Sequence, residues 1–107
     1  MALLEPLDIQ EAVDGVINLK DVPNGATARI AEPPNHTPDD LVSVLIADKE
    51  VVSDAPAGEW VDGFLSVTIS RAHLLNHTGP QKKFSYILYY GGANRSDSEP
   101  TYYDIAH

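Results

Sequence analysis

Residues 65–70 read Leu65-Ser66-Val67-Thr68-Ile69-Ser70, and in this stretch every apolar side chain is followed by a hydroxyl side chain. Successive side chains of a β-strand point to opposite faces of the sheet, so Leu65, Val67 and Ile69 share one face. β-Branched residues also favour strands. The stretch therefore predicts a strand with one face in a core and the other in water.

The same alternation recurs along the rest of the chain, between short clusters of Pro and Gly. It predicts further strands at 7–9, 16–17, 26–31, 41–47, 84–90 and 102–105. Their inward positions predict a core that contains Ile30, Val42, Val44, Leu65, Val67, Ile69, Tyr86, Leu88 and Ile105. Only residues 70–76 predict helix, a single turn that Ser70 would cap. About seven short strands with frequent turn signals are typical of an all-β antiparallel sandwich.

Length and composition exclude several classes of protein. The 107 residues suit one domain, 1–107, with 16 acidic and 7 basic side chains and a formal charge of −9. The absence of Cys excludes disulfides, thiolate zinc sites and thiol catalysis. The acidic balance argues against nucleic acid and against attachment to an anionic membrane. No apolar run approaches the roughly 18 residues of a membrane span, so we expect a soluble chain without membrane insertion.

Segments spread over the whole chain carry a resemblance to a known family. They are Leu4–Pro6, Glu11–Ile17, Val22–Ile30, Asp40–Val44, Leu65–Ser70, Phe84–Leu88 and Ser98–Ile105. Their order resembles the bacterial immunoglobulin-like repeats of long, multi-domain surface and adhesin-type proteins of Gram-negative bacteria. Two features depart from immunoglobulin domains in general: the only Trp, Trp60, is in a loop-like context rather than on a central strand, and there is no disulfide.

This resemblance implies an immunoglobulin-like antiparallel β-sandwich of about seven strands. It also implies a non-catalytic module with a spacer or adhesion role, in tandem with neighbouring domains of the same chain. The expected location is extracellular or at the cell surface, as part of a longer exported chain.

The aromatic residues predict an alternative function. Tyr86, Tyr90 and Tyr103 are on inward stripes, and the hydroxyl of Tyr86 is a candidate for a tyrosine corner. Tyr89 and Tyr102 point outward, and we expect them to lie side by side on neighbouring strands. Together with Trp60, these two tyrosines are the candidate contact residues for a carbohydrate or protein ligand.

Metal and catalytic sites have weaker support. His73 and His77 have the spacing of a zinc pair, but the segment is too short for a stable helix, so we expect surface histidines. Carboxylates cluster at Asp39-Asp40, Asp48/Glu50 and Asp97/Glu99, which we interpret as a solvated acidic surface with calcium binding as the alternative. No nucleophile elbow or phosphate-binding loop occurs. We therefore expect no enzyme, no cofactor and no resident metal.

Exposed sheet edges need protection against pairing with other chains, and charged residues or Pro supply it. We expect Pro6, Lys82-Lys83 and Asp104 to serve this purpose.

Overall fold

The computed structural model describes residues 4–32, 39–56, 60, 63–91 and 94–106. In this part of the chain there are nine strands and two short helical segments. The strands are β1 (Asp8–Ile9), β2 (Val16–Asn18), β3 (Ala26–Ala31), β4 (Leu41–Ile46), β5 (Lys49–Pro56), β6 (Phe64–Ile69), β7 (Gly79–Tyr90), β8 (Asn94–Asp97) and β9 (Thr101–Ala106). The helical segments are the 3-10 turn η1 (Leu19–Asp21) and the α-helix α1 (Arg71–Leu75).

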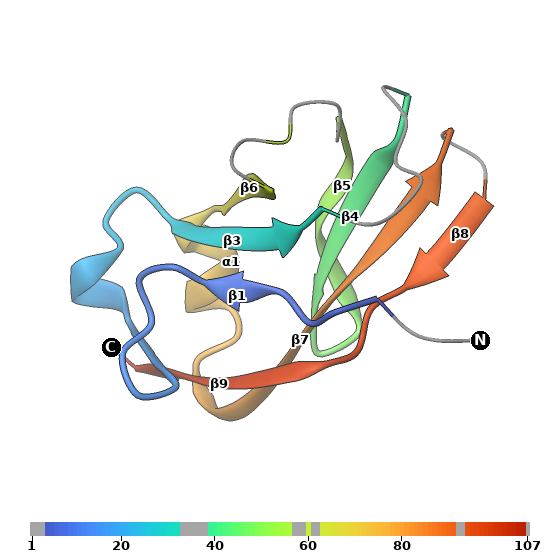
Figure 1. Cartoon of the computed structure of the whole chain (residues 1–107). Helices are drawn as coiled ribbons and strands as arrows, with labels where there is room; N and C mark the ends of the chain where they lie inside the picture. Colours follow the sequence, from blue (N-terminus) through green and yellow to red (C-terminus); the bar gives the residue numbers. More distant parts are fainter. Residues whose placement is uncertain (1–3, 33–38, 57–59, 61–62, 92–93, 107) are drawn as a thin grey trace.

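The strands form two sheets that pack face to face (Figure 1). The small sheet has the order β1-β3-β6, and the large sheet has the order β2-β9-β7-β4-β5, with β8 paired to β7. Strands that follow each other in the chain often belong to different sheets, so the chain crosses repeatedly between the two layers of the sandwich. The fold is an all-β sandwich of two packed sheets, as the sequence predicts.

The start of the chain contributes to both sheets. β1 pairs with β3 in the small sheet, and β2 crosses to the large sheet and pairs with β9. The pairing of β2 with β9 is parallel, with Val16 opposite Asp104 and Ile17 opposite Ile105. Nearly all other pairs are antiparallel, so this contact is a departure from the expected antiparallel arrangement.

The core lies between the sheets and contains the residues that the alternation selects. Every residue of the expected core is at most 8% exposed. In β3 and β6 the inward and outward positions alternate strictly, with Ile30 opposite Leu65. Phe84 is fully buried and contacts Tyr103 edge to face, with ring centroids 5.4 Å apart. Burial of this apolar surface is the main source of stability of the fold.

The predicted strands and the predicted helical turn are all present. Ser70 caps α1, because its Oγ accepts a hydrogen bond from the backbone N–H of His73. Two strands were not predicted, β5 and β8, and β7 begins at Gly79 rather than at Phe84. In the described part of the chain, no helix combines the length and apolar character that a membrane crossing requires.

The expected protection of the sheet edges is partly wrong. Lys82 and Lys83 lie on β7, which has β9 on one side and β4 on the other. Asp104 lies on β9, between β7 and β2. Of the expected residues only Pro6 precedes an edge strand, β1.

Candidate functional site

The outer face of the large sheet is the candidate site. Along β7, Phe84, Tyr86 and Leu88 point into the core. The residues between them, among them Ser85 and Ile87, therefore point to the outer face. This alternation continues to Lys83 at one end and to Tyr89 at the other.

A shallow depression of about 160 Å³ lies on this outer face. Leu45 of β4, Ile87 of β7 and Pro100 contribute apolar surface to it. Ile87 is only 8% exposed, although it is not part of the core cluster between the sheets. The register explains its burial, because Ile87 has Ser43 opposite it on β4 and Asp97 opposite it on β8.

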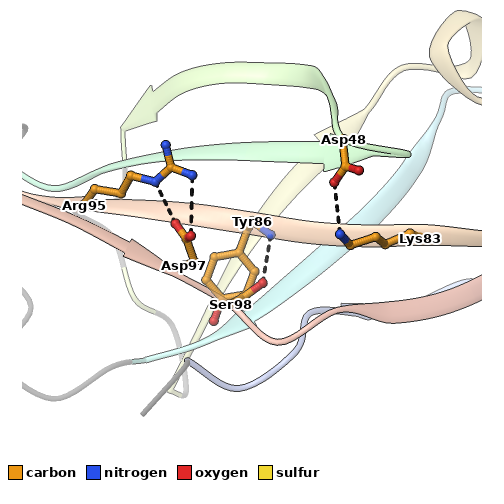
Figure 2. Close-up of polar contacts among 6 residues, drawn as sticks. All are labelled: Asp48, Lys83, Tyr86, Arg95, Asp97 and Ser98. Atoms are coloured by element: carbon orange, nitrogen blue, oxygen red, sulfur yellow. Dashed lines mark hydrogen bonds and ion pairs between the residues drawn. The ribbon is translucent and has the colours of Figure 1, made fainter. Parts of the chain in front are cut away.

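An ion pair borders the depression at each end (Figure 2). Lys83 Nζ lies 3.0 Å from Asp48 Oδ1, and Arg95 Nε lies 2.8 Å from Asp97 Oδ1. The hydrogen bond to Asp48 raises the pKa of Lys83, and the hydrogen bond to Asp97 raises the pKa of Arg95. Both pairs are exposed, so their contribution to stability is small. They leave the depression with a polar, nearly neutral rim on an otherwise acidic protein.

Next to the depression, the pairing of β7 passes from one neighbouring strand, β9, to another, β8. β8 pairs with the second half of β7, and β9 pairs with the first half. Between them, the Oγ of Ser98 accepts a hydrogen bond from the backbone N–H of Tyr86 at 2.9 Å (Figure 2). The backbone N–H of Ser98 donates to the carbonyl oxygen of Tyr86 at 3.0 Å. These two bonds keep β7 paired where the neighbouring strand is interrupted.

Tyr89 and Tyr102 share the outer face but do not lie side by side. Tyr102 is exposed and lies opposite Lys83, whereas Tyr89 is half-buried and lies opposite Arg95. Lys83 and Tyr89 are six positions apart on β7, which corresponds to about 20 Å along the strand. The expectation that Tyr89 and Tyr102 lie side by side is therefore wrong. Each tyrosine instead lies opposite a cationic side chain.

Trp60 does not join this surface. It lies in the connection between β5 and β6, is half-buried, and packs against the hydrophobic core. The structure therefore does not bring the three candidate aromatic residues together into one platform.

The other titratable clusters have internal roles. Nδ1 of His77 lies 2.8 Å from the carbonyl oxygen of His73, so this ring bonds within α1 and its C-terminal turn. The expectation of a solvated acidic surface is wrong for Asp40, which is buried and accepts a hydrogen bond from the backbone N–H of Gly91 at 2.8 Å. Among the described residues, no three His, Asp or Glu side chains are grouped so as to hold a metal ion. His36 and His107 lie outside the described residues.

The sequence predicts the position of only some of the residues around the depression. Alternation along β7 assigns Lys83, Ser85 and Ile87 to the outer face. Asp48 was predicted only as part of an acidic cluster, and Arg95 was not predicted, because they belong to a hairpin turn and a strand that the sequence pattern did not predict. No family model, no curated protein and no solved structure matches the chain.

Proposed function

We propose that this protein is a non-catalytic, immunoglobulin-like module of a bacterial surface or exported protein, with a spacer or adhesion role. Its partners would be neighbouring domains of the same chain. The observation that supports the proposal is the parallel pairing between the first and the last described segments of the chain.

This pairing occurs at two places. Near the start, the backbone N–H of Leu4 donates to the carbonyl oxygen of Asp97 at 3.0 Å, and the N–H of Glu99 donates to the carbonyl oxygen of Leu4 at 2.8 Å. Farther on, β2 pairs with β9, and the N–H of Asp104 donates to the carbonyl oxygen of Gly15 at 2.9 Å.

The parallel direction matters for a domain that carries tension. If the chain is pulled from its first and last segments, two parallel strands must slide along each other. Their hydrogen bonds run across the strands and are therefore loaded together, whereas in an antiparallel hairpin pulled open they break one at a time. Resistance to force depends on the rate of unfolding, and shared loading lowers that rate. A spacer between tandem domains needs this property.

Single-molecule force spectroscopy tests the proposal. The module is placed between two handle domains and pulled through residues 4 and 106. Asp104→Pro removes the N–H that donates to Gly15 and also the carboxylate that accepts from the N–H of Gln81 at 2.8 Å. Asp104→Ala removes only the carboxylate, so it is the matched control. We expect a lower unfolding force for Asp104→Pro than for Asp104→Ala, with both variants folded by circular dichroism. Equal forces for the two variants contradict the proposal.

A second candidate function is favoured by the outer face of the large sheet. Tyr89 and Tyr102 present aromatic surface on the same face as the depression, whose lining is mixed polar and apolar. Such a surface suits a carbohydrate or protein ligand. Because the two tyrosines lie far apart, an extended ligand fits this face better than a small one.

Substitution separates the two candidates. Tyr89→Ser with Tyr102→Ser would abolish binding in a glycan or protein binding screen if the face is a ligand site. The same double variant would leave the unfolding force of a spacer unchanged, because neither side chain belongs to the parallel pairing.

A further inference from the structure

The free edge of β6 differs from the other sheet edges. In the described part of the chain β6 pairs only with β3, and its six residues include no charged residue and no Pro. The other edge strands are protected in the usual ways. β1 and β2 are only two and three residues long, and β5 and β8 carry charged side chains. β6 is thus the long, uncharged edge of this sandwich.

The hydrogen-bond pattern shows which backbone groups point to this edge. The carbonyl oxygen of Gly63 accepts from the N–H of Glu32 at 2.9 Å, so these two residues form a hydrogen-bonded pair of the β3–β6 ladder. Such pairs alternate along antiparallel strands. The N–H and C=O groups of Phe64, Ser66 and Thr68 therefore point away from β3.

An independent contact on β3 agrees with this assignment. Thr27 lies opposite Thr68, and its carbonyl oxygen accepts from the N–H of Gln10 on the far side of β3. The backbone N–H and C=O groups of Thr27 thus point away from β6, as the alternation of hydrogen-bonded pairs requires.

The side chains on this edge are accessible. Ser66 and Thr68 are exposed, and Phe64 is 37% exposed, with the guanidinium of Arg29 4.2 Å from its ring centroid. Leu65, Val67 and Ile69 point into the core. A strand that pairs here meets an open edge and polar or aromatic side chains on the outer face of the small sheet.

We propose that two copies of this chain pair through β6, antiparallel and symmetric about Ser66. In this register Ser66 lies opposite Ser66 of the second copy, and Phe64 lies opposite Thr68 of the second copy. All residues in these pairs have N–H and C=O groups that point away from β3. Three such pairs with two hydrogen bonds each give about six hydrogen bonds between the copies. Every inward side chain stays inward, because opposite residues share a face. The two small sheets join into one continuous sheet across a two-fold axis.

A second copy fits because the outward backbone groups of Phe64, Ser66 and Thr68 are spaced evenly about Ser66, so an antiparallel copy of β6 meets each of them. Charge decides where on the surface two such copies can meet. Each copy carries a formal charge of −9, so two copies repel over most of their surfaces. β6 carries no charged residue and has Arg29 beside Phe64, so this repulsion is low along its edge. At physiological ionic strength the Debye length is about 8 Å, which screens the more distant charges. Association therefore strengthens as salt concentration rises, the opposite of an interface held by ion pairs.

Cysteine crosslinking tests the register, since the chain has no Cys of its own. In a hydrogen-bonded pair the Cα atoms are about 5.5 Å apart, which suits a disulfide. Ser66→Cys should therefore form a disulfide dimer under mild oxidation. Thr68→Cys is the matched control, because the two Thr68 positions would be about 14 Å apart. We expect crosslinking of Ser66→Cys to be at least about tenfold faster than that of Thr68→Cys. Equal rates would overturn the proposal.

Sedimentation equilibrium on the complete chain tests the association itself. We expect a monomer–dimer equilibrium that shifts toward dimer between low and high salt. Ser66→Lys places two like charges on the two-fold axis and should give a monomer under all conditions. Ser53→Lys adds the same charge at an exposed position of β5 and should dimerise like the wild type. A wild-type chain that stays monomeric at every concentration and salt, or a Ser66→Lys variant that dimerises like the wild type, would overturn the proposal.

Discussion

The hydroxyl of Tyr86 donates a hydrogen bond to the carbonyl oxygen of Glu5 at 2.7 Å, across 81 positions of the chain. A tyrosine corner bonds to the backbone a few residues upstream. The bond here instead fastens the first described segment of the chain to the central strand of the large sheet. Leu4, the residue before Glu5, is held in addition by its two backbone bonds to Asp97 and Glu99.

Tyr86→Phe tests the strength of this attachment. The variant keeps the buried ring and loses one hydrogen bond, so we expect a loss of about 0.5–1.5 kcal/mol in the free energy of unfolding. Urea denaturation measures this value. Tyr102→Phe, which removes a hydroxyl from an exposed ring, should change it by less than about 0.5 kcal/mol. Equal effects of the two substitutions would show that the bond to Glu5 contributes nothing.

The free energy of unfolding should fall at alkaline pH, in part because of Tyr86. Burial raises the pKa of Tyr86 well above its usual range, and burial also raises the pKa of Tyr103. The folded state keeps these protons when the unfolded state has begun to lose them, above about pH 10. Their contribution is therefore complete at neutral pH and is lost as the pH rises above 10, by up to about 1.4 kcal/mol per pH unit for each tyrosine.

Chemical denaturation between pH 8 and pH 12 measures this dependence. Tyr86→Phe removes one of the titrating groups, so its free energy of unfolding should fall less steeply above pH 10 than that of the wild type. If the two proteins lose stability in parallel, Tyr86 is not responsible for the alkaline transition.

The expected strands are confirmed because each one places a clear apolar stripe against the core. β6 is the simplest case, since Leu65, Val67 and Ile69 are all at most 8% exposed and their hydroxyl neighbours are exposed. A stripe with period two is a local property of the sequence. It identifies the strands and the core without any knowledge of which strands are neighbours.

The two missed strands lack such local signals. The turn between β4 and β5 consists of Ala47 and Asp48, which both have positive φ, where Gly or Asn is the usual signal. β5 also contains irregularities in its pairing with β4, which disturb its alternation. The four residues of β8 are polar, so they show no apolar stripe at all.

Pairing partners and register were also not predictable. Alternation correctly assigned Tyr89 and Tyr102 to the outer face, but it says nothing about which residues of β7 they face. The interruption at Ser98 divides the partner of β7 into β8 and β9, and this separates the two tyrosines. The depression and its ion pairs depend on the same long-range register.

The two phenylalanines provide a test of where the stability lies. Phe84 is fully buried, so Phe84→Ala should cost about 3–5 kcal/mol. Phe64 is 37% exposed and contacts Arg29, so Phe64→Ala should cost only about 1 kcal/mol. Thermal and urea denaturation measure both values. Similar costs at the two positions would contradict the assignment of Phe64 to the surface.

A substitution in the hairpin turn between β4 and β5 should stabilise the protein. Ala47 has a φ of 53°, a conformation that costs a residue with a Cβ about 1 kcal/mol or more. We expect Ala47→Gly to raise the free energy of unfolding by about 0.5–1 kcal/mol. Ala72→Gly, at an exposed position of α1, should lower it by a similar amount, because Gly is unfavourable in a helix. Destabilisation by both substitutions would contradict the strain at Ala47.

At Gly25 an added methyl group should lower the free energy of unfolding more than at Gly15. It lies directly before β3 with a φ of +101°, and an added Cβ would overlap the backbone carbonyl of Ile69 at the end of β6. Gly15 also has a positive φ, of +77°, but an added Cβ there has no atom within 4 Å. Gly15→Ala therefore measures backbone strain alone, and we expect a cost of about 1–2 kcal/mol. Gly25→Ala adds a clash with backbone that cannot move without separating β3 from β6, so its cost should exceed that of Gly15→Ala by at least about 1 kcal/mol. Urea denaturation of the two variants gives this difference directly, and equal costs would mean that the close approach of Gly25 to Ile69 does not constrain the fold.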